Sequence, residues 1–141
     1  MKYRKFGSLD WNVSEIGLGC WQIGADWGNV SEDKANEVLQ SSFENGVNFF
    51  DTADVYGDGR SEKFVGNFIN SISDRIYVAT KAGRRINPHV ANGYYDKELM
   101  ESFVDRSLSN LNIETIDLLQ MHCPPTEVYS SDQTFEMLYY L

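Results

Sequence analysis

The fold is decided by residues 47–57, which read Val47-Asn48-Phe49-Phe50-Asp51-Thr52-Ala53-Asp54-Val55-Tyr56-Gly57. The apolar half of this stretch is short, rich in aromatic residues and preceded by the turn residues Asn45-Gly46, a pattern that predicts a buried strand. Asp51 then stands at the carboxyl end of that strand. In sheets built from repeated strand–helix units, this is the end at which binding and catalytic groups gather.

Two later apolar segments also end in polar side chains. Residues 76–80 lead into Lys81, and residues 116–121 lead into His122. Because the carboxyl ends of parallel strands meet at one edge of a sheet, we expect these two side chains to lie near Asp51. This joint placement is the main indication of function in the sequence.

Helices are predicted between the strands, and a hairpin is predicted before them. Ser31, Asp96 and Asp132 are expected to cap three of these helices, and Ser61 is expected to open the fourth. The hairpin is expected from residues 2–6 and 12–16, and another strand is expected at residues 16–20. Residues 84–95 are interpreted as an irregular segment, because Pro88 and Gly93 interrupt them.

Strand and helix alternate four times after the hairpin, which implies a parallel sheet with right-handed crossovers. A complete (β/α)8 barrel needs roughly 250 residues or more, whereas this chain has 141 and stops within a helical pattern. We therefore expect an α/β fold of the (β/α)8 TIM-barrel type. Residues 1–141 would be a single incomplete domain that supplies the hairpin and about four strand–helix units.

Composition restricts the classes of function. A content of 42% hydrophobic and 23% charged residues is typical of a soluble globular domain. The net charge of -9 argues against a nucleic-acid partner, and no apolar run is long enough to predict a membrane span. Cys20 and Cys123 lie far apart and no secretion leader is evident, so a cytoplasmic location is expected.

The polar residue types favour proton transfer to a carbonyl group. Lys81 near Tyr56 would favour release of the tyrosine proton and make Tyr56 a more effective general acid. Asp51 would pair with Lys81, and His122 would orient the reacting oxygen. The sequence shows no nucleophile set and no metal-ligand spacing, so no metal is expected and a cofactor must supply the hydride.

Each of these residues alone also has a structural explanation. Asp51 could cap a turn, Tyr56 could pack at a rim, and Lys81 could be a solvated charge. His122, which precedes Cys123, could be a loop histidine with satisfied hydrogen bonds. The four-residue set is favoured only because its members occupy equivalent strand ends.

Two tryptophans follow the strand predicted at residues 16–20. Trp21 and Trp27 could cap the core, but in a loop at this end of a sheet we interpret them as walls of a pocket. His89 lies in a polar segment and is interpreted as a surface residue.

Four segments together resemble the N-terminal half of the aldo-keto reductases. They are Gly17-Leu18-Gly19-Cys20-Trp21, Phe50-Asp51-Thr52-Ala53-Asp54-Val55-Tyr56-Gly57 with the later Ser61-Glu62, Val78-Ala79-Thr80-Lys81, and Asp117-Leu118-Leu119-Gln120-Met121-His122. They occur in the family's order and cover nearly the whole chain. The residues around Tyr56 and the segment His122-Cys123-Pro124-Pro125 most resemble bacterial members related to potassium-channel β subunits.

The resemblance implies a barrel closed at its bottom by the hairpin, and reduction of aldehydes or ketones with NADPH or, in some members, NADH. It implies a catalytic tetrad of Asp51, Tyr56, Lys81 and His122, with Tyr56 as the proton donor. The expected cofactor-binding residues are Cys20, Trp21 and Asp51, and the expected substrate-binding residues are Trp21, Trp27, Tyr56 and His122.

Three hypotheses about function follow from these patterns. The first is an oxidoreductase that acts, as the intact protein, on small-molecule carbonyl compounds. The second is a half-barrel without turnover that serves as a binding or regulatory module and covers its sheet edges by forming a homo-oligomer. The third is a channel-type auxiliary subunit that uses the reductase fold as a redox sensor. The family's remaining cofactor contacts come from the second half of the barrel, so activity of these 141 residues alone is a separate question.

Overall fold

The structure, a computed structural model, describes residues 1–24 and 28–141. The strands are β1 (Tyr3–Lys5), β2 (Asn12–Ser14), β3 (Leu18–Gly19), β4 (Phe49–Asp51), β5 (Tyr77–Ala82) and β6 (Leu118–Met121). The α-helices are α1 (Glu32–Glu44), α2 (Arg60–Ile69), α3 (Ala91–Tyr95), α4 (Lys97–Leu111) and α5 (Asp132–Tyr140), and the short 3-10 helices are η1 (Gln22–Gly24) and η2 (Thr126–Ser130).

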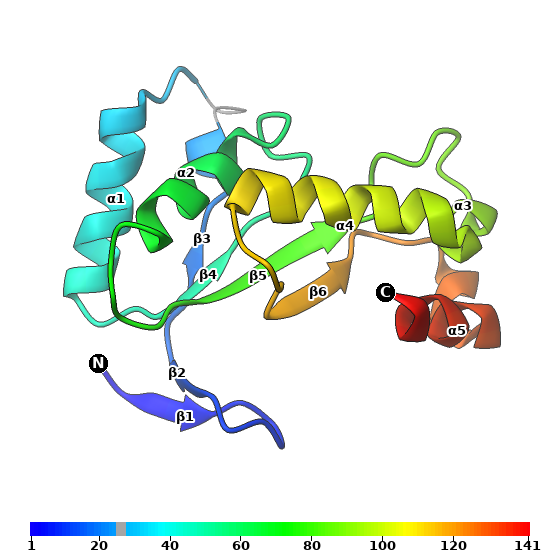
Figure 1. Cartoon of the computed structure of the whole chain (residues 1–141), viewed down its shortest axis with the longest axis horizontal. Helices are drawn as coiled ribbons and strands as arrows, with labels where there is room; N and C mark the ends of the chain where they lie inside the picture. Colours follow the sequence, from blue (N-terminus) through cyan, green and yellow to red (C-terminus); the bar gives the residue numbers. More distant parts are fainter. Residues whose placement is uncertain (25–27) are drawn as a thin grey trace.

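The main sheet is parallel and has the strand order β3-β4-β5-β6 (Figure 1). Each strand pairs with the next strand of the sheet along the chain, and helices lie between them in the sequence. This is the arrangement of successive strand–helix units in a barrel, so the predicted α/β fold of the TIM-barrel type is confirmed as a partial barrel. In the register of β5 and β6, Lys81 lies opposite Gln120.

The two faces of the sheet differ because successive side chains in a strand point to opposite sides. Phe50 and Val78 are almost completely buried and belong to a hydrophobic cluster that α1, α2 and α4 complete. Asp51 and Lys81 occupy alternate positions in the same strands. The pleat of the sheet therefore directs the charged side chains away from the helix-covered core.

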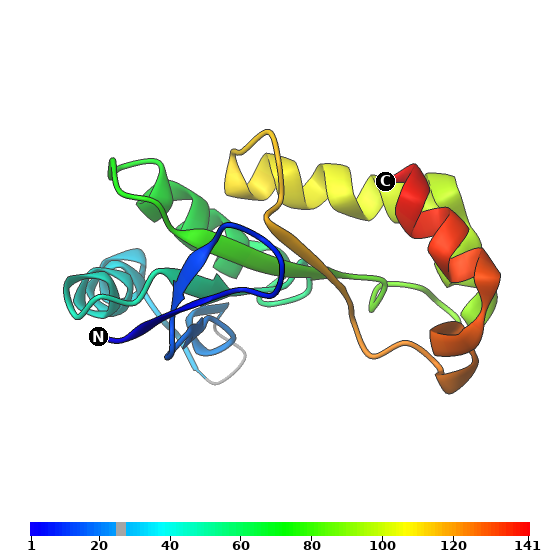
Figure 2. The ribbon, with the colours of Figure 1, turned by 90° about the horizontal axis from the view of Figure 1, so that it is seen from below.

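The amino ends of the strands are covered by the hairpin of β1 and β2 (Figure 2). The rings of Phe6 and Phe49 stack with centroids 5.8 Å apart, and those of Trp11 and Tyr77 stack at 4.9 Å. Phe49 and Tyr77 are the first residues of β4 and β5. Aromatic packing thus closes this end of the sheet, as the family resemblance implied.

Two predicted helix caps are confirmed. The Ser31 side chain accepts a hydrogen bond from the Lys34 amide at 3.2 Å, and the Asp96 side chain accepts one from the Leu99 amide at 3.0 Å. These bonds satisfy backbone donors that have no partner within the first turn of a helix. The short polar side chains therefore fix where α1 and α4 begin.

Helix α2 begins at Arg60, one residue before the expected Ser61, after a left-handed Gly59, and the Ser61 side chain is buried in tertiary contacts. Two other expectations differ from the structure. Ser131 is the N-cap residue of α5, so Asp132 is its first helical residue. The segment expected to be irregular contains the short helix α3, in which Tyr94 is fully buried in a second hydrophobic cluster.

Candidate active site

Three neighbouring strands bring the candidate site together. Asp51 is the last residue of β4, Lys81 is the second-last residue of β5, and His122 follows β6 directly. The amide of His122 donates to the carbonyl of Ala82 at 2.8 Å, which continues the pairing of β5 and β6 past the end of the strand. The expected gathering at the carboxyl ends of the strands is therefore present.

An ion pair lies at the centre of the site. Lys81 Nζ donates to Asp51 Oδ1 at 2.5 Å and to the carbonyl oxygen of Thr52 at 2.7 Å. Gln120 Nε2 donates to the other carboxylate oxygen, Asp51 Oδ2, at 3.0 Å. The Lys81 side chain is only 14% exposed, so most of the surrounding water is replaced by these fixed partners. The sequence patterns did not indicate Gln120, although it is a polar residue in an otherwise apolar strand.

Tyr56 lies beside this ion pair. Lys81 Nζ is 4.9 Å from the centre of the Tyr56 ring, and the His122 ring meets Tyr56 edge to face at a centroid distance of 5.9 Å. The Trp21 ring stacks against Tyr56 at 6.1 Å and is 44% exposed. The structure thus brings the four predicted catalytic residues and Trp21 into one group.

The loop that carries Tyr56 has an unusual backbone. Gly57, Asp58 and Gly59 are all left-handed, with φ of 60°, 55° and 88°. A side-chain carbon at Gly57 would collide with the carbonyl of Gly24, so only glycine fits this position. This tight turn directs the chain from β4 into α2 and leaves the Tyr56 ring beside Lys81.

A set of arginines holds the same loop from outside. Arg85 Nε donates to Asp54 Oδ2 at 2.9 Å, and Arg85 Nη2 donates to Asp58 Oδ1 at 2.6 Å. Arg106 Nη2 also donates to Asp58 Oδ1, at 2.7 Å. Burial raises the pKa of Asp54, and the Arg85 charge opposes this effect. The hydrogen bond from Arg85, followed by the charge of Arg106, lowers the pKa of Asp58.

Cys20 occupies a different environment from the one expected of a cofactor contact. It is completely buried in the hydrophobic cluster, and burial raises the pKa of its thiol to about 12. Its carbonyl accepts a hydrogen bond from Ser61 at 2.7 Å, and Ser61 accepts one from Thr52 at 2.9 Å. Its amide donates to the carbonyl of Asp51 at 2.8 Å. This geometry favours a packing role, and cofactor contact by Cys20 stays a prediction.

A buried carboxylate supports the sheet beneath the site. Glu62 is completely buried, accepts a hydrogen bond from Thr80 at 2.6 Å and accepts another from Asn110 at 2.8 Å. Thr80 directly precedes Lys81 in β5 and points to the opposite side. This network therefore ties α2 and α4 to the strand that presents the lysine.

The surroundings of His122 favour its neutral form. Burial lowers the pKa of its ring, and the nearby charges of Lys81 and Arg84 lower it further. Its Nδ1 is buried and makes no hydrogen bond to any residue that the structure describes. A neutral imidazole has one N–H donor and one acceptor nitrogen, so it can hydrogen-bond to a carbonyl oxygen without transferring a charge.

Two other expected residues can now be placed. His89, interpreted as a surface residue, is half-buried, with Nε2 3.0 Å from the carbonyl oxygen of Cys123. Loop packing brings it there, which a polar sequence context does not reveal. Trp27, predicted to be a pocket wall, lies outside the described residues.

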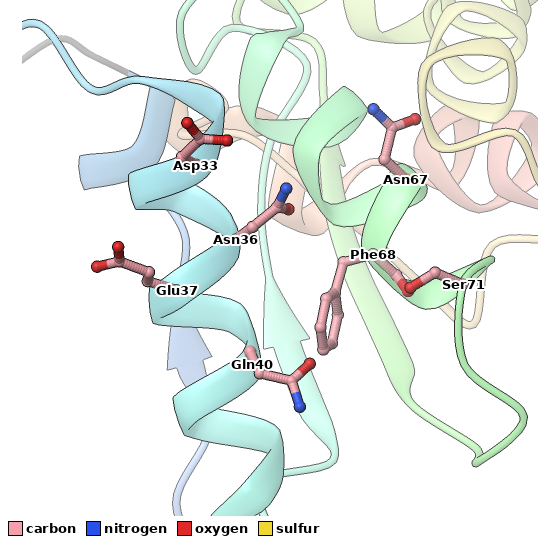
Figure 3. A pocket seen from close by; sticks show the side chains of 7 residues that line it. All are labelled: Asp33, Asn36, Glu37, Gln40, Asn67, Phe68 and Ser71. Carbon is pink, nitrogen blue, oxygen red and sulfur yellow. The ribbon is translucent and has the colours of Figure 1, made fainter.

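A surface groove of about 510 Å³ lies apart from this site, between α1 and α2 (Figure 3). It is lined by Asp33, Asn36, Glu37, Gln40, Asn67, Phe68 and Ser71. Within residues 1–24 and 28–141, no cluster of three or more histidine, cysteine or acidic residues is placed to hold a metal ion. None of the helices in this described part has the length and apolar character needed to cross a bilayer.

Comparison with known proteins places this geometry in a family. Residues 15–140 match the Aldo/keto reductase family. Oxidoreductase YqkF of Bacillus subtilis (strain 168) is 39% identical over 124 residues, which are 86% of this chain and 39% of that protein. The NADP(+) aldo-keto reductase yakc of Schizosaccharomyces pombe is 34% identical over 123 residues, which are 84% of this chain and 36% of that protein.

A solved structure gives the same result. The holo form of aldo-keto reductase AKR11C1 from Bacillus halodurans superposes with a TM-score of 0.81 at 33% identity, covering 99% of this chain and 45% of that one. The chain thus spans about two-fifths of the length of the curated relatives it matches. That residues 1–141 form one incomplete domain stays a prediction. On the family match and this agreement in fold, the chain belongs to the aldo/keto reductase family.

Proposed function

We propose that the intact protein is an NAD(P)H-dependent oxidoreductase that reduces small aldehydes or ketones to alcohols. The observation that carries this proposal is the position of Tyr56, with Lys81 Nζ 4.9 Å from its ring centre and the His122 ring at 5.9 Å. A phenol beside a fixed ammonium and a neutral imidazole suits the delivery of a proton to a carbonyl oxygen.

Each residue has a separate part in the proposed reaction. Tyr56 donates its proton to the oxygen of the substrate. The ammonium of Lys81 lies close enough to attract the negative charge that develops on the Tyr56 oxygen as the proton leaves. Asp51 holds Lys81 in place, and neutral His122 hydrogen-bonds to the substrate oxygen and orients the carbonyl.

The residues at the strand ends fit the nicotinamide part of the cofactor. The half-exposed Trp21 ring next to Tyr56 offers a flat aromatic wall, and Asp51 and Gln120 supply polar groups beside it. NADPH, when bound, supplies the hydride that no side chain can supply. The name of the Schizosaccharomyces pombe relative, which includes NADP(+), supports this cofactor, and NADH is the alternative. A reducing, cytoplasmic location is also proposed, since Cys20 and Cys123 are both free thiols.

Substitution of Tyr56 tests the proposal. The intact protein is mixed with NADPH and a panel of aldehydes and ketones, and cofactor oxidation is followed by absorbance. Tyr56→Phe should lower kcat by roughly 100- to 10,000-fold, because it removes only the proton donor. Tyr139→Phe is the matched control, since Tyr139 is 92% exposed. An unchanged rate in Tyr56→Phe, or no turnover of any carbonyl by the folded wild type, would contradict the proposal.

The second candidate is a half-barrel module that pairs with another copy. Among the described residues, β3 and β6 each pair with one neighbour only, so both edges of the sheet are open. A groove of about 370 Å³, lined mostly by apolar side chains, lies between α4, the segment that leads into β6 and the end of α5, and includes Leu119 and Leu138. Open edges of this kind favour pairing with another strand. Sedimentation tests this candidate, because a folded 16.1 kDa monomer without a partner would exclude it.

A further inference from the structure

We propose that Gln120 is a positioning residue that fixes the carboxylate of Asp51 and, through it, the ammonium of Lys81. This inference rests on the proposed reductase function. It adds a fifth side chain, from a third strand, to the four residues that the sequence suggested.

The two oxygens of Asp51 have different partners. Oδ1 accepts from Lys81 Nζ at 2.5 Å, and Oδ2 accepts from Gln120 Nε2 at 3.0 Å. Lys81 and Gln120 are opposite each other in the register of β5 and β6, whereas Asp51 ends β4. The Asp51 carboxylate on β4 therefore accepts one hydrogen bond from a side chain of each of the next two strands, β5 and β6.

A second bond is needed because one bond does not fix a carboxylate. The outer torsion of an aspartate has broad energy wells, so the Lys81 contact alone leaves the plane of the Asp51 carboxylate free to turn. The Asp51 side chain is 36% exposed, and water competes for any oxygen without a protein donor. The bond from Gln120 to the other oxygen removes this freedom.

The position of the carboxylate matters for Lys81. Its ammonium is held by Asp51 Oδ1 and the Thr52 carbonyl and lies 4.9 Å from the Tyr56 ring centre. A turn of the Asp51 carboxylate would draw the ammonium away from Tyr56. Displacements of about one ångström in a catalytic arrangement can cost roughly 100-fold in rate.

The chemistry of an amide suits this place. Gln120 donates a hydrogen bond without a charge, so it does not compete with Lys81 as a counter-ion of Asp51. A cation at position 120 would compete with Lys81 for the Asp51 carboxylate, and an anion at position 120 would repel that carboxylate. The arrangement is thus specific for a neutral donor of this length.

Two substitutions of Gln120 in the intact protein test the inference. Gln120→Leu removes the donor, and Gln120→Glu keeps the size but places a second carboxylate against Asp51. Gln40→Leu is the matched control, because Gln40 Nε2 donates to Glu44 Oε1 at 2.7 Å on the exposed side of α1. Circular dichroism melting curves verify that each variant is folded.

The expected result is a loss in kcat with little change in KM. Gln120→Leu should lower kcat by roughly 10- to 100-fold, Gln120→Glu should lower it further, and KM should stay within about two-fold. In an Asp51→Ala background, which lacks both acceptor oxygens, Gln120→Leu should have no further effect. The inference is overturned if either variant keeps the wild-type kcat, or if the two substitutions act independently.

A readout without turnover separates this inference from the proposed function. Fluorotyrosine is incorporated, and the fluorine NMR signal of position 56 is assigned from the signal lost in Tyr56→Phe. Both Gln120 variants should move this signal toward its position in Lys81→Met, whereas Gln40→Leu should leave it unchanged. A signal that stays in place in the Gln120 variants overturns the inference whatever the substrate is. A lack of effect of Tyr56→Phe on activity would instead overturn the proposed function.

Discussion

Each end of the parallel sheet carries a group of three side chains, a cation, a carboxylate and a tyrosine, but the surroundings of the two groups differ. At the carboxyl end, Lys81 lies 4.9 Å from the ring centre of Tyr56 and pairs with Asp51. At the amino end, the guanidinium of Arg75 also lies 4.9 Å from a tyrosine ring, that of Tyr77, and pairs with Asp117. Each trio contains a cation, a carboxylate and a phenol ring.

The two trios differ in the exposure of their cations and, in the opposite order, of their carboxylates, since Asp51 is 36% exposed and Asp117 is 9% exposed. The cation is 14% exposed in Lys81 and 63% exposed in Arg75. Asp117 also accepts a hydrogen bond from the amide of Val78 at 2.9 Å, so it helps to join β5 and β6. Water screens the exposed guanidinium of Arg75, while the largely buried ammonium of Lys81 acts on Tyr56 with less screening. Similar groups of side chains thus join two strands at the amino end and form the candidate catalytic site at the carboxyl end.

Removal of each cation gives the largest expected difference between the ends. In the intact protein, Lys81→Met should lower kcat/KM for carbonyl reduction by roughly 100- to 1,000-fold, because Tyr56 loses the charge that assists proton release. Arg75→Met should stay within about two-fold, since Arg75 lies at the opposite end of the sheet from Tyr56 and its guanidinium is 63% exposed. Steady-state kinetics checks both values. Equal losses in the two variants would remove the distinction between the trios.

The arginine beneath the Tyr56 loop should matter most for stability. Arg85→Met leaves the carboxylate of Asp54 fully buried without its ion partner, and the free energy of unfolding should fall by about 3 kcal/mol. Arg4→Met, which breaks the exposed pair with Glu15, is the control and should change it by less than about 0.5 kcal/mol. Urea titrations measure both variants. Similarly small losses in both variants would show that the Arg85–Asp54 ion pair is not needed for stability.

A tryptophan at each end sharpens the contrast further. Trp11→Ala removes the stacks on Tyr77 and Phe6 and should cost about 2 kcal/mol of unfolding free energy, with kcat unchanged below the melting transition. Trp21→Ala removes the half-exposed ring beside Tyr56 and should mainly raise the KM for NADPH. Thermal melts and steady-state kinetics are measured on both variants. A loss of activity in Trp11→Ala together with a loss of stability in Trp21→Ala would contradict the assignment of Trp11 to packing and Trp21 to the site.

Much of the site was predictable because its signals are local. A polar residue after an apolar strand identified Asp51 and His122, and strand alternation in a parallel sheet was enough to place them at one edge. The caps Ser31 and Asp96 were predictable for the same reason, since a cap acts within one helical turn.

Contacts that depend on register and loop path were not predictable. Gln120 lies two residues before His122, but only the pairing of Gln120 with Lys81 in the register of β5 and β6 brings its side chain to Asp51. Ser61 has the residue type of a cap, yet a left-handed Gly59 starts the helix and leaves Ser61 to bind elsewhere. No spacing rule in the sequence specifies such tertiary partners.

The smallest expected effect concerns the pH dependence of stability at the carboxyl end. Burial, followed by Lys81, lowers the pKa of His122 below its ordinary value of 6.5, so the unfolded chain binds this proton more tightly than the folded protein. The stability linked to His122 is therefore present above pH 6.5 and is lost as the pH falls below it. His122→Asn should remove this acid-side loss, by less than about 1 kcal/mol, in denaturant titrations at a series of pH values. Lys81→Met should shrink the same loss, since it removes one cause of the shift. An unchanged slope in His122→Asn would mean that other groups set the acid sensitivity of this end.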